Sequence, residues 1–362
     1  MGRLLAADAV KVYVLPADAW GCGHYRLIWP ANVLQREGHE VVIMPPDKNT
    51  GFMAKVRDEG DGSSPILTAV SVPDDADVIV IQRPSHPLQP QMIQMIRDNK
   101  IALVIDMDDD MSTIHPNNVA FHHYRPSSST PYSWKWAIES CKLASLVTTS
   151  TRQLQRIYAK HGRGMVLDNY VPEAYLRYPK EETGCFGWAG TTKSHPNDLQ
   201  ITGRAVQDLM NEGHCFKVVG GKSRVQECLR LTEPPECTGS IPLVHWVGVI
   251  GENMDVGMVP LAPTAFNTAK SRLKGIEYMA IGVPWVGSPR EEYRRLARES
   301  GCGILADNAK QWYAGIKQLM TDDVLRKEQA EAGRTYMQDQ TYQAQAWRWL
   351  EAWTRALEFE RG

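Results

Sequence analysis

The chain has 362 residues, which is enough for two domains of ordinary size. Its formal net charge at pH 7 is only −2, so it lacks the overall basic field of a nonspecific nucleic-acid-binding protein. No apolar run reaches the ~20 residues of a membrane-spanning helix, and the first residues lack the apolar core of a secretion signal. We therefore expect a cytoplasmic protein with no membrane span.

The cysteines are consistent with a cytoplasmic location. There are seven of them, and no two form a Cys-x-x-Cys pair, which argues against a disulfide framework and against a zinc site. We interpret them as reduced thiols that pack as small apolar groups. The histidines show no zinc-type spacing either, so no metal site is expected.

In the first half of the chain, short apolar runs alternate with helical patterns. Strands are predicted at 11–16, 39–46, 75–84, 101–110 and 146–150, and helices at 29–38, 135–145 and 151–162. This alternation is typical of a parallel sheet that is covered by helices on both faces. Such sheets bind ligands beyond the carboxyl ends of their strands.

The alternation breaks at residues 168–184, where prolines, tyrosines and mixed charges predict a domain junction. A second alternation follows, with strands predicted at 185–190, 214–221, 254–261 and 283–288, and helices at 198–213 and 270–281. The apolar run 243–250 fits either a strand or a loop. The sequence thus predicts two doubly wound α/β domains, 1–170 and 171–340, and a C-terminal helix at 341–362 that packs back on the body.

Two motifs of the first domain are candidates for lining a ligand cleft. Glycines at a strand-to-helix turn, here including Gly23, let backbone N–H groups approach an anion, although a tight turn without a ligand has the same pattern. His24 lies beside this turn. Asp108, in the run Asp-Met-Asp-Asp-Asp, ends another strand and could bind a cation, cap a helix or accept hydrogen bonds from a sugar. His115 could face the same crevice, or could be an ordinary surface histidine.

Two further motifs lie in the second domain. The strand predicted to end at Gly190 is followed by a polar loop, in which Lys193 and His195 are placed to meet a charged ligand. The simpler alternative is an ordinary helix start, capped by Asn197 or Asp198.

The other motif of this domain is the helix predicted at 270–281. With Thr268 as its N-cap, free backbone N–H groups would join the positive charges of Lys270 and Arg272 to form a seat for a diphosphate. Glu277, about two turns into the helix, could then accept hydrogen bonds from the two vicinal hydroxyls of a ribose. The alternative is a solvated charged face, which the flanking apolar strands disfavour.

Together these motifs resemble the GT-B fold glycosyltransferases, in particular the retaining "glycosyl transferases group one", with bacterial and phage-encoded members. The stretches 21–30, 187–199 and above all 266–284 carry the resemblance. It implies two Rossmann-like domains that face each other across a cleft and a nucleotide-sugar donor, most simply a UDP-sugar. It also implies a retaining reaction. No permanently bound cofactor is expected, and no metal is needed if Lys193, Lys270 or Arg272 and helix N-termini neutralise the phosphates. Many members carry paired glutamates eight positions apart; here Ala269 stands at the first position, so this glutamate is missing or is replaced in its role by Lys270 or Asn267.

The resemblance also suggests roles for particular residues. It assigns the diphosphate to the segment that includes Lys270, Ser271 and Arg272, and the ribose to Glu277. Gly190, Lys193 and His195 complete the expected donor site. The expected catalytic residues are Gly23, His24, Asp108 and His115.

The acceptor is expected to be a hydroxyl group, and two kinds of acceptor stay open. Some phage enzymes of this fold glycosylate hydroxymethylated bases in DNA, and the aromatic and basic segment 122–136 could grip DNA with a flipped base. The alternative acceptor is a small glycan or a lipid-linked sugar. A sugar-nucleotide epimerase and a noncatalytic sugar-nucleotide-binding protein of the same fold are the other two hypotheses.

Overall fold

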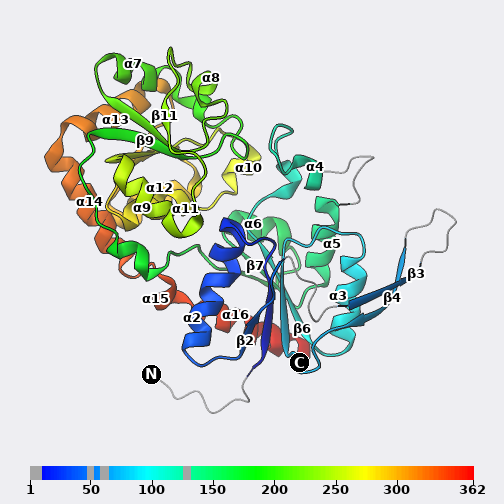
Figure 1. Ribbon diagram of the computed structural model, residues 1–362. Helices are drawn as coiled ribbons and strands as arrows, with labels where there is room; N and C mark the ends of the chain where they lie inside the picture. Colours follow the sequence, from blue (N-terminus) through cyan, green and yellow to red (C-terminus); the bar gives the residue numbers. More distant parts are fainter. Residues whose placement is uncertain (1–9, 47–52, 58–64, 125–131) are drawn as a thin grey trace. The chain divides into compact units, whose positions relative to one another are not determined.

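The computed structural model describes residues 10–46, 53–57, 65–124 and 132–362. Contacts within the chain divide it into two units (Figure 1). Unit 1 combines Met1–Ile114, His122–Asn169 and Tyr342–Gly362. Unit 2 combines His115–Phe121 and Tyr170–Thr341. Each unit is therefore assembled from segments that are distant in sequence.

Unit 1 is built on a parallel sheet with the strand order β2-β1-β5-β6-β7-β8. Its strands are β1 (Val12–Leu15), β2 (Val41–Ile43), β5 (Val78–Gln82), β6 (Ala102–Met107), β7 (Leu146–Thr149) and β8 (Gly164–Val166). Every residue of β5 and β6 is buried, because a parallel sheet is covered on both faces. The alternation in the sequence predicted this sheet and its central strands correctly.

The helices of unit 1 cover the two faces of this sheet. They are α1 (Gly21–Gly23), the π-helix η1 (His24–Ile28), α2 (Trp29–Arg36), α3 (Gln89–Asp98), η2 (Met111–Thr113), α5 (Trp134–Leu143), α6 (Arg152–Tyr158), α15 (Tyr342–Gln345) and α16 (Trp347–Arg361). The short helix α4 (Phe121–Tyr124) lies where the chain passes from unit 2 to unit 1.

The C-terminal segment packs back on the body, as predicted, and it packs on unit 1. Helix α16, red in Figure 1, contacts β5, β6 and β7. The Trp349 indole is fully buried and donates a hydrogen bond to the Arg26 carbonyl at 2.7 Å. The Tyr342 hydroxyl donates to the Tyr25 carbonyl at 2.5 Å. These bonds fix α15 and α16 to the π-helix η1.

An antiparallel hairpin in unit 1 was not predicted. Its strands are β3 (Met53–Arg57) and β4 (Ile66–Ser71), and Figure 1 shows it beside α3. Leu67 is its buried anchor, and the Leu67 amide donates to Gln91 Oε1 on α3 at 2.9 Å. Most of β4 is exposed, so the hairpin lacks the long apolar run by which the other strands were recognised.

Unit 2 repeats the doubly wound plan, with the strand order β11-β10-β9-β12-β13-β14. Its strands are β9 (Cys185–Gly190), β10 (Cys215–Gly220), β11 (Glu236–Cys237), β12 (Val256–Val259), β13 (Trp285–Gly287) and β14 (Ile304–Leu305). Neighbouring strands are parallel throughout, with Trp188 opposite both Val218 and Met258. Trp188 and Trp312 are almost fully buried in the core of this unit.

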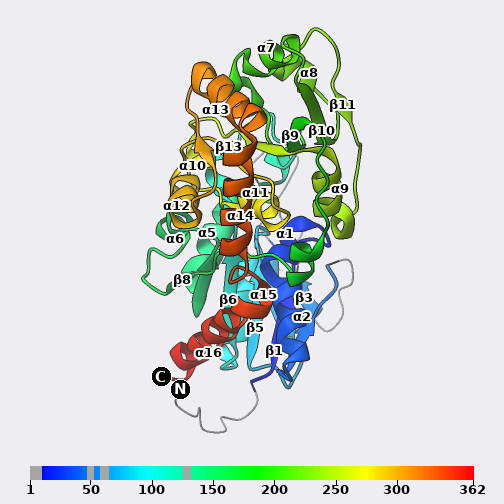
Figure 2. The same cartoon turned by 90° about the vertical axis from the view of Figure 1, so that its left-hand side faces the viewer.

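The helices of unit 2 include several that the sequence did not predict. They are η3 (Glu173–Arg177), η4 (Leu199–Thr202), α7 (Ala205–Asn211), α8 (Val225–Leu229), η5 (Leu243–His245), α9 (Trp246–Asn253), α10 (Ala265–Thr268), α11 (Leu273–Ala280), α12 (Glu291–Ser300), α13 (Ala309–Thr321) and α14 (Asp323–Met337). The run 243–250, which the sequence left open between a strand and a loop, is helical in η5 and α9, and Val247 and Ile250 form a buried face of α9. Figure 2 shows α13 and α14 in orange.

Two predicted helices of unit 2 are interrupted. The helix predicted at 198–213 breaks into η4 and α7 at Gly203, whose φ of 60° is left-handed. The helix predicted at 270–281 begins only at Leu273, and Thr268 is not its N-cap. Thr264 instead caps the separate short helix α10, by accepting the Asn267 amide at 3.2 Å.

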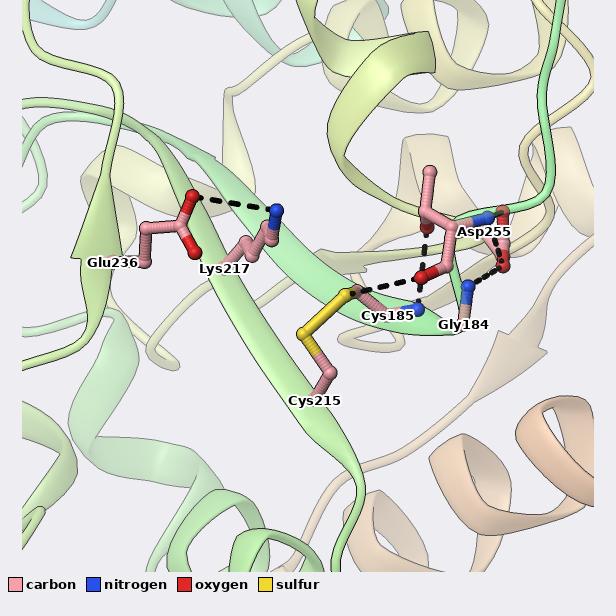
Figure 3. Close-up of a disulfide and its surroundings, with 7 residues drawn as sticks. Gly184, Cys185, Cys215, Lys217, Glu236 and Asp255 are labelled. Carbon is pink, nitrogen blue, oxygen red and sulfur yellow. Dashed lines mark hydrogen bonds and ion pairs between the residues drawn. A yellow bond between two sulfur atoms is a disulfide. The ribbon is translucent and has the colours of Figure 1, made fainter.

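One expectation about the cysteines was wrong. Cys185 and Cys215, which lie directly opposite each other on β9 and β10, form a disulfide with a Cα–Cα distance of 4.5 Å (Figure 3). The other five cysteines are free thiols. The pairing was missed because it depends on the register of two parallel strands, which sequence spacing does not reveal.

Candidate active site

The carboxyl edge of the sheet in unit 1 holds a compact ionic cluster. Arg83 follows β5 directly and has a left-handed backbone, with φ at 51°. Its guanidinium forms a two-point ion pair with Asp108, one contact being 2.6 Å, and contacts Asp109 at 3.2 Å. It also donates to the Cys22 sulfur at 3.2 Å. Backbone strain of this kind is common at functional sites, which makes the cluster a candidate for ligand binding.

A second ion pair lies deeper at the same edge and is completely buried. Arg26 donates from Nε and Nη2 to the two oxygens of Asp106, at 2.9 and 2.8 Å. Arg26 Nη1 also donates to the Leu167 carbonyl and to Asn169 Oδ1. Asp106 accepts a further bond from the Thr148 hydroxyl at 2.7 Å. The pair therefore joins the π-helix, β6 and β7 to the end of the segment His122–Asn169, and its role is structural.

Two predicted catalytic residues, Gly23 and His24, lie on the turn after β1. A Cβ on Gly23 would lie 1.9 Å from the Asp18 carbonyl oxygen, so only glycine fits there. The Gly23 amide donates to Asp18 Oδ1 at 3.0 Å. His24 Nδ1 is 2.8 Å from the Trp20 carbonyl. Burial raises the pKa of the neighbouring Cys22 to about 12, so this thiol is protonated and is not a nucleophile.

The other two predicted catalytic residues are in different units. Asp108 belongs to the ionic cluster of unit 1 with Arg83. His115 groups with unit 2, and its Nδ1 accepts the Asn117 amide at 3.0 Å. From the sequence, Asp108 and His115 could face the same crevice. The contacts within the chain group Asp108 with unit 1 and His115 with unit 2.

In unit 2, β9 and β10 end in bare backbone at their carboxyl edge. These strands end at Gly190 and Gly220, which lie opposite each other. A Cβ on Gly220 would lie 2.1 Å from the Gly190 carbonyl oxygen, and the φ of Gly220 is 134°. Two glycines at a strand end leave room for a ligand to approach the main chain closely.

Helix α11 is fastened to this edge by two of its side chains. Lys274 donates from Nζ to the Ala189 carbonyl. The Tyr278 hydroxyl accepts the Ala189 amide at 3.0 Å and donates to the Met258 carbonyl at 3.2 Å. Burial lowers the pKa of Lys274, while the nearby Glu277 carboxylate opposes that shift. Glu277, one turn further along, is itself only 5% exposed.

His195, in the loop after β9, forms a hydrogen-bonded triad with Asp198 and Asn267. Its Nδ1 lies 2.8 Å from Asp198 Oδ2, so Asp198 fixes the ring with its proton on Nδ1. Asp198 Oδ1 accepts from the Ala262 amide at 2.9 Å and from Asn267 Nδ2 at 2.6 Å. Partial burial lowers the pKa of His195, partly offset by the bond to Asp198 and reinforced by the positive charge of Lys270. At neutral pH the imidazole is therefore uncharged.

The remaining predicted donor residues include Lys193 and the turn from Lys270 to Arg272. Lys193 is exposed on the loop, and Lys270 lies between α10 and α11, with its ammonium 4.5 Å from the Phe266 ring centroid. Ser271 is partly buried in the same turn. Arg272 is buried and pairs with Glu299 at 2.6 Å, so part of its charge is used inside unit 2.

Several residues of these two edges were not recognised from the sequence. Arg83 and Tyr278 are the clearest examples, and Asn267 was considered only as a substitute for the missing glutamate. Arg83 could have been found, because a charged residue directly after an apolar strand lies at the ligand-binding edge. The role of Tyr278 had no such signal, since an aromatic on an apolar helix face is usually plain core.

The part of the chain that the structure describes holds neither a metal-binding cluster nor a membrane-spanning helix. No group of three or more His, Cys, Asp or Glu side chains there is arranged to hold a metal ion. None of the helices described is long and apolar enough to cross a membrane.

Comparison with known proteins identifies the fold. Neither the protein-family models nor the curated proteins gave a match. Among solved structures, a glycosyltransferase from Rickettsia africae has a TM-score of 0.62 and 12% identity, over 97% of this chain and 100% of its own. Sucrose-phosphate synthase from Thermosynechococcus elongatus has a TM-score of 0.64 and 14% identity, over 96% and 99%. Anabaena HepE in complex with UDP has a TM-score of 0.58 and 12% identity, over 94% and 99%. The likeness extends over nearly the whole of each chain, and this protein therefore has the GT-B fold of those structures.

Proposed function

We propose that the protein is a glycosyltransferase that moves a sugar from a UDP-sugar to an acceptor hydroxyl. The observation that carries the proposal is the carboxyl edge of unit 2. There β9 and β10 end in bare backbone at Gly190 and Gly220, the His195 triad follows β9, and α11, which carries Glu277, is bonded to the Ala189 carbonyl through Lys274. An edge of this kind suits a nucleotide. The HepE structure, which has the same fold, was solved with UDP.

In the proposed donor site, Glu277 accepts hydrogen bonds from the two ribose hydroxyls. Lys193 and Lys270 carry the positive charge that opposes the diphosphate, and Ser271 supports it from the turn between α10 and α11. The charge on these two lysines is the reason for proposing a reaction without a metal. Arg272 supports this turn through its pair with Glu299.

The proposed reaction is a direct transfer with retention. The acceptor oxygen forms a bond to the anomeric carbon of the sugar while the bond from that carbon to the phosphate oxygen breaks. UDP leaves with the electron pair, and the acceptor proton passes to the departing phosphate oxygen. The residues of the chain act by positioning the reactants and by stabilising the charge on the diphosphate, so no protein nucleophile is required.

The position of Ala269, where related proteins often carry a glutamate, bears on how the sugar is held. Ala269 is fully buried and offers no polar group. Asn267 is not a free substitute, since its amide donates to Asp198 and to the Ala262 carbonyl. We therefore propose that Lys270 and the His195 triad contact the sugar or the phosphate beside it.

The charges of unit 1 favour a neutral acceptor over DNA. Asp108, Asp109 and Asp110 follow β6, and Arg83 is paired with the first two. Carboxylates in excess repel a phosphate backbone and can accept hydrogen bonds from sugar hydroxyls. In the segment 122–136, the rings of His123 and Tyr132 stack with their centroids 4.6 Å apart. Arg125 of this segment lies outside the described residues. Transfer from UDP-sugars is expected to small sugar acceptors and not to hydroxymethylated DNA.

The test of the donor site is calorimetric titration of UDP into the wild type and Glu277→Gln. Loss of a charge-assisted bond to the ribose should weaken UDP binding by ~1.5–3 kcal/mol, or about 10- to 150-fold. The matched control is Asp255→Asn, which removes a buried carboxylate at the amino end of the same sheet, where it binds the Thr183 and Gly184 amides. That control should bind UDP like the wild type. Equal affinity in a folded Glu277→Gln protein would remove Glu277 from the site.

A further inference from the structure

A short segment from the first half of the chain belongs to unit 2. Residues 115–121, here called the strap, group with unit 2, although the residues on both sides of them group with unit 1. The strap lies against residues 191–198, here called the donor loop, which carry Lys193 and His195. The donor loop is therefore not held by the second half of the chain alone.

Two hydrogen bonds join the strap to the donor loop. The Val119 amide donates to the Lys193 carbonyl at 3.0 Å, and Asn118 Nδ2 donates to the Ser194 carbonyl at 2.9 Å. Asn118 is only 6% exposed. The two carbonyls are consecutive, so these bonds fix both the position and the direction of the main chain between Lys193 and His195.

The strap holds Asn118 rigidly in the orientation that this contact needs. Asn118 Oδ1 accepts the Ala120 amide at 2.9 Å. An amide N–H can only donate and a carbonyl can only accept, so the oxygen must face Ala120 and the nitrogen must face Ser194. The main chain of Asn118 is also bonded on both sides, to the His115 carbonyl and the Phe121 amide. Asn118 is thus preorganised by its own segment.

Other bonds fasten the donor loop on either side of this stretch, and within the loop the Lys193 amide and the Ser194 hydroxyl both donate to Thr191, at 3.3 and 3.4 Å. The Thr192 hydroxyl donates to the Ser223 carbonyl, and His195 is bonded to Asp198. Between these two anchors the Lys193 side chain is exposed and extends from the loop. The bonds from the strap are therefore placed to set where the Lys193 ammonium and the His195 ring meet a ligand.

We propose that Asn118 is a positioning residue for the donor loop, holding the main chain of Lys193 and Ser194 so that Lys193 and His195 contact the diphosphate of the nucleotide sugar. This inference rests on the proposed function for the identity of the ligand. The contact itself does not depend on it. Asn118 does not touch the ligand in this proposal, and its loss should affect phosphate binding more than binding of the nucleoside.

The test is Asn118→Asp, which keeps the acceptor for the Ala120 amide and turns the donor to Ser194 into a carboxylate oxygen. UDP affinity should fall about five- to tenfold, the size expected for one net hydrogen bond. Uridine affinity should stay unchanged, and with UDP-sugar the KM should rise while kcat stays within about twofold. Should the Asp variant not fold, Asn118→Ala is the second variant.

The matched control is Asn253→Asp in α9. Asn253 Nδ2 donates to the Val249 carbonyl at 2.8 Å, the same kind of bond in the same unit. It should leave UDP affinity unchanged. The inference is overturned by wild-type UDP affinity in Asn118→Asp, by equal weakening of UDP and uridine, or by the same UDP loss in the control.

Hydrogen exchange separates this inference from the proposed function. In the wild type the Val119 amide should be protected by its bond to Lys193, and in Asn118→Asp that protection should fall at least tenfold. If the wild type binds no UDP, the proposed function fails and the ligand assigned here fails with it. Even then, a loss of protection at the Val119 amide in Asn118→Asp would support the proposal that Asn118 positions the donor loop. Retained protection would overturn it.

Discussion

The guanidinium of Arg26 is almost fully buried in unit 1, and its ion-pair partner is the fully buried carboxylate of Asp106. Arg26→Met would leave Asp106 buried and unpaired, which typically costs ~3–5 kcal/mol. We expect a loss of that size in the free energy of unfolding of unit 1, measured with denaturant. Lys142→Met is the control, because Lys142 and Glu139 form an exposed pair of unit 1 that is worth less than ~1 kcal/mol. Similar losses in the two variants would contradict the assignment.

His195 should make the stability of the protein depend on pH below neutrality. Its pKa is lowered in the folded chain by burial, so the unfolded chain binds more protons as the pH falls through the usual histidine range. The stabilisation is therefore complete above about pH 6.5, the usual histidine pKa, and is lost as the pH drops toward the lowered one. The free energy of unfolding of the wild type, minus that of His195→Gln, should fall between pH 7.5 and 5.5 by less than ~1.4 kcal/mol per pH unit.

The comparison with His195→Gln cancels the other groups that titrate in this range. His86, His123 and His161 also have pKa values lowered mainly by burial, and they remain in both proteins. In Asp198, burial alone would raise the pKa, but the bonds from His195, Ala262 and Asn267 lower it overall. A constant difference between the two proteins over this pH range would mean that His195 is not held uncharged in the fold.

Among the elements, β9 and β10 are joined by both main-chain pairing and the Cys185–Cys215 disulfide (Figure 3). The cysteines are 30 residues apart, and a crosslink closing such a loop typically stabilises by ~3–4 kcal/mol. We expect a reductant to lower the unfolding midpoint of the wild type. The double variant Cys185→Ala/Cys215→Ala should be less stable and should not respond to the reductant. A midpoint in the wild type that ignores the reductant would show that the thiols are not bonded in solution.

The elements also show what the sequence could predict and why. Central strands such as β5 and β12 were found because burial on both faces demands an unbroken apolar run. The first residues of helices were harder to predict. Thr264 and Thr268 are chemically alike, and only the turn between α10 and α11 decides which of them caps a helix. The glycines and charges of the candidate site were visible in the sequence. Contacts such as Asn118 to Ser194 were not, because they join residues 76 apart.

At the scale of the molecule, unit 1 depends on the end of the chain. Removal of 342–362 would expose the side of the sheet that α16 covers and would leave the Tyr25 and Arg26 carbonyls without their donors. We expect the truncated protein to lose protease resistance in unit 1 while 170–341 stays resistant. Trp349→Ala should weaken unit 1 by ~3–5 kcal/mol, the usual cost of deleting a buried tryptophan.

The control for this prediction is Trp347→Ala, because that side chain is 53% exposed. It should leave the protease pattern unchanged. Wild-type resistance of unit 1 after truncation would mean that α15 and α16 are dispensable for its fold.

The return of residues 342–362 to unit 1 has a consequence for synthesis. On the ribosome, domains usually fold in the order in which they emerge. Here the segments of unit 2 have all been translated before the last helix of unit 1 exists. The first-made half must therefore wait, with the sheet face that α16 will cover still open to solvent. The nascent chain is most exposed to aggregation and most in need of a chaperone in that interval, which ends only after α16 leaves the exit tunnel.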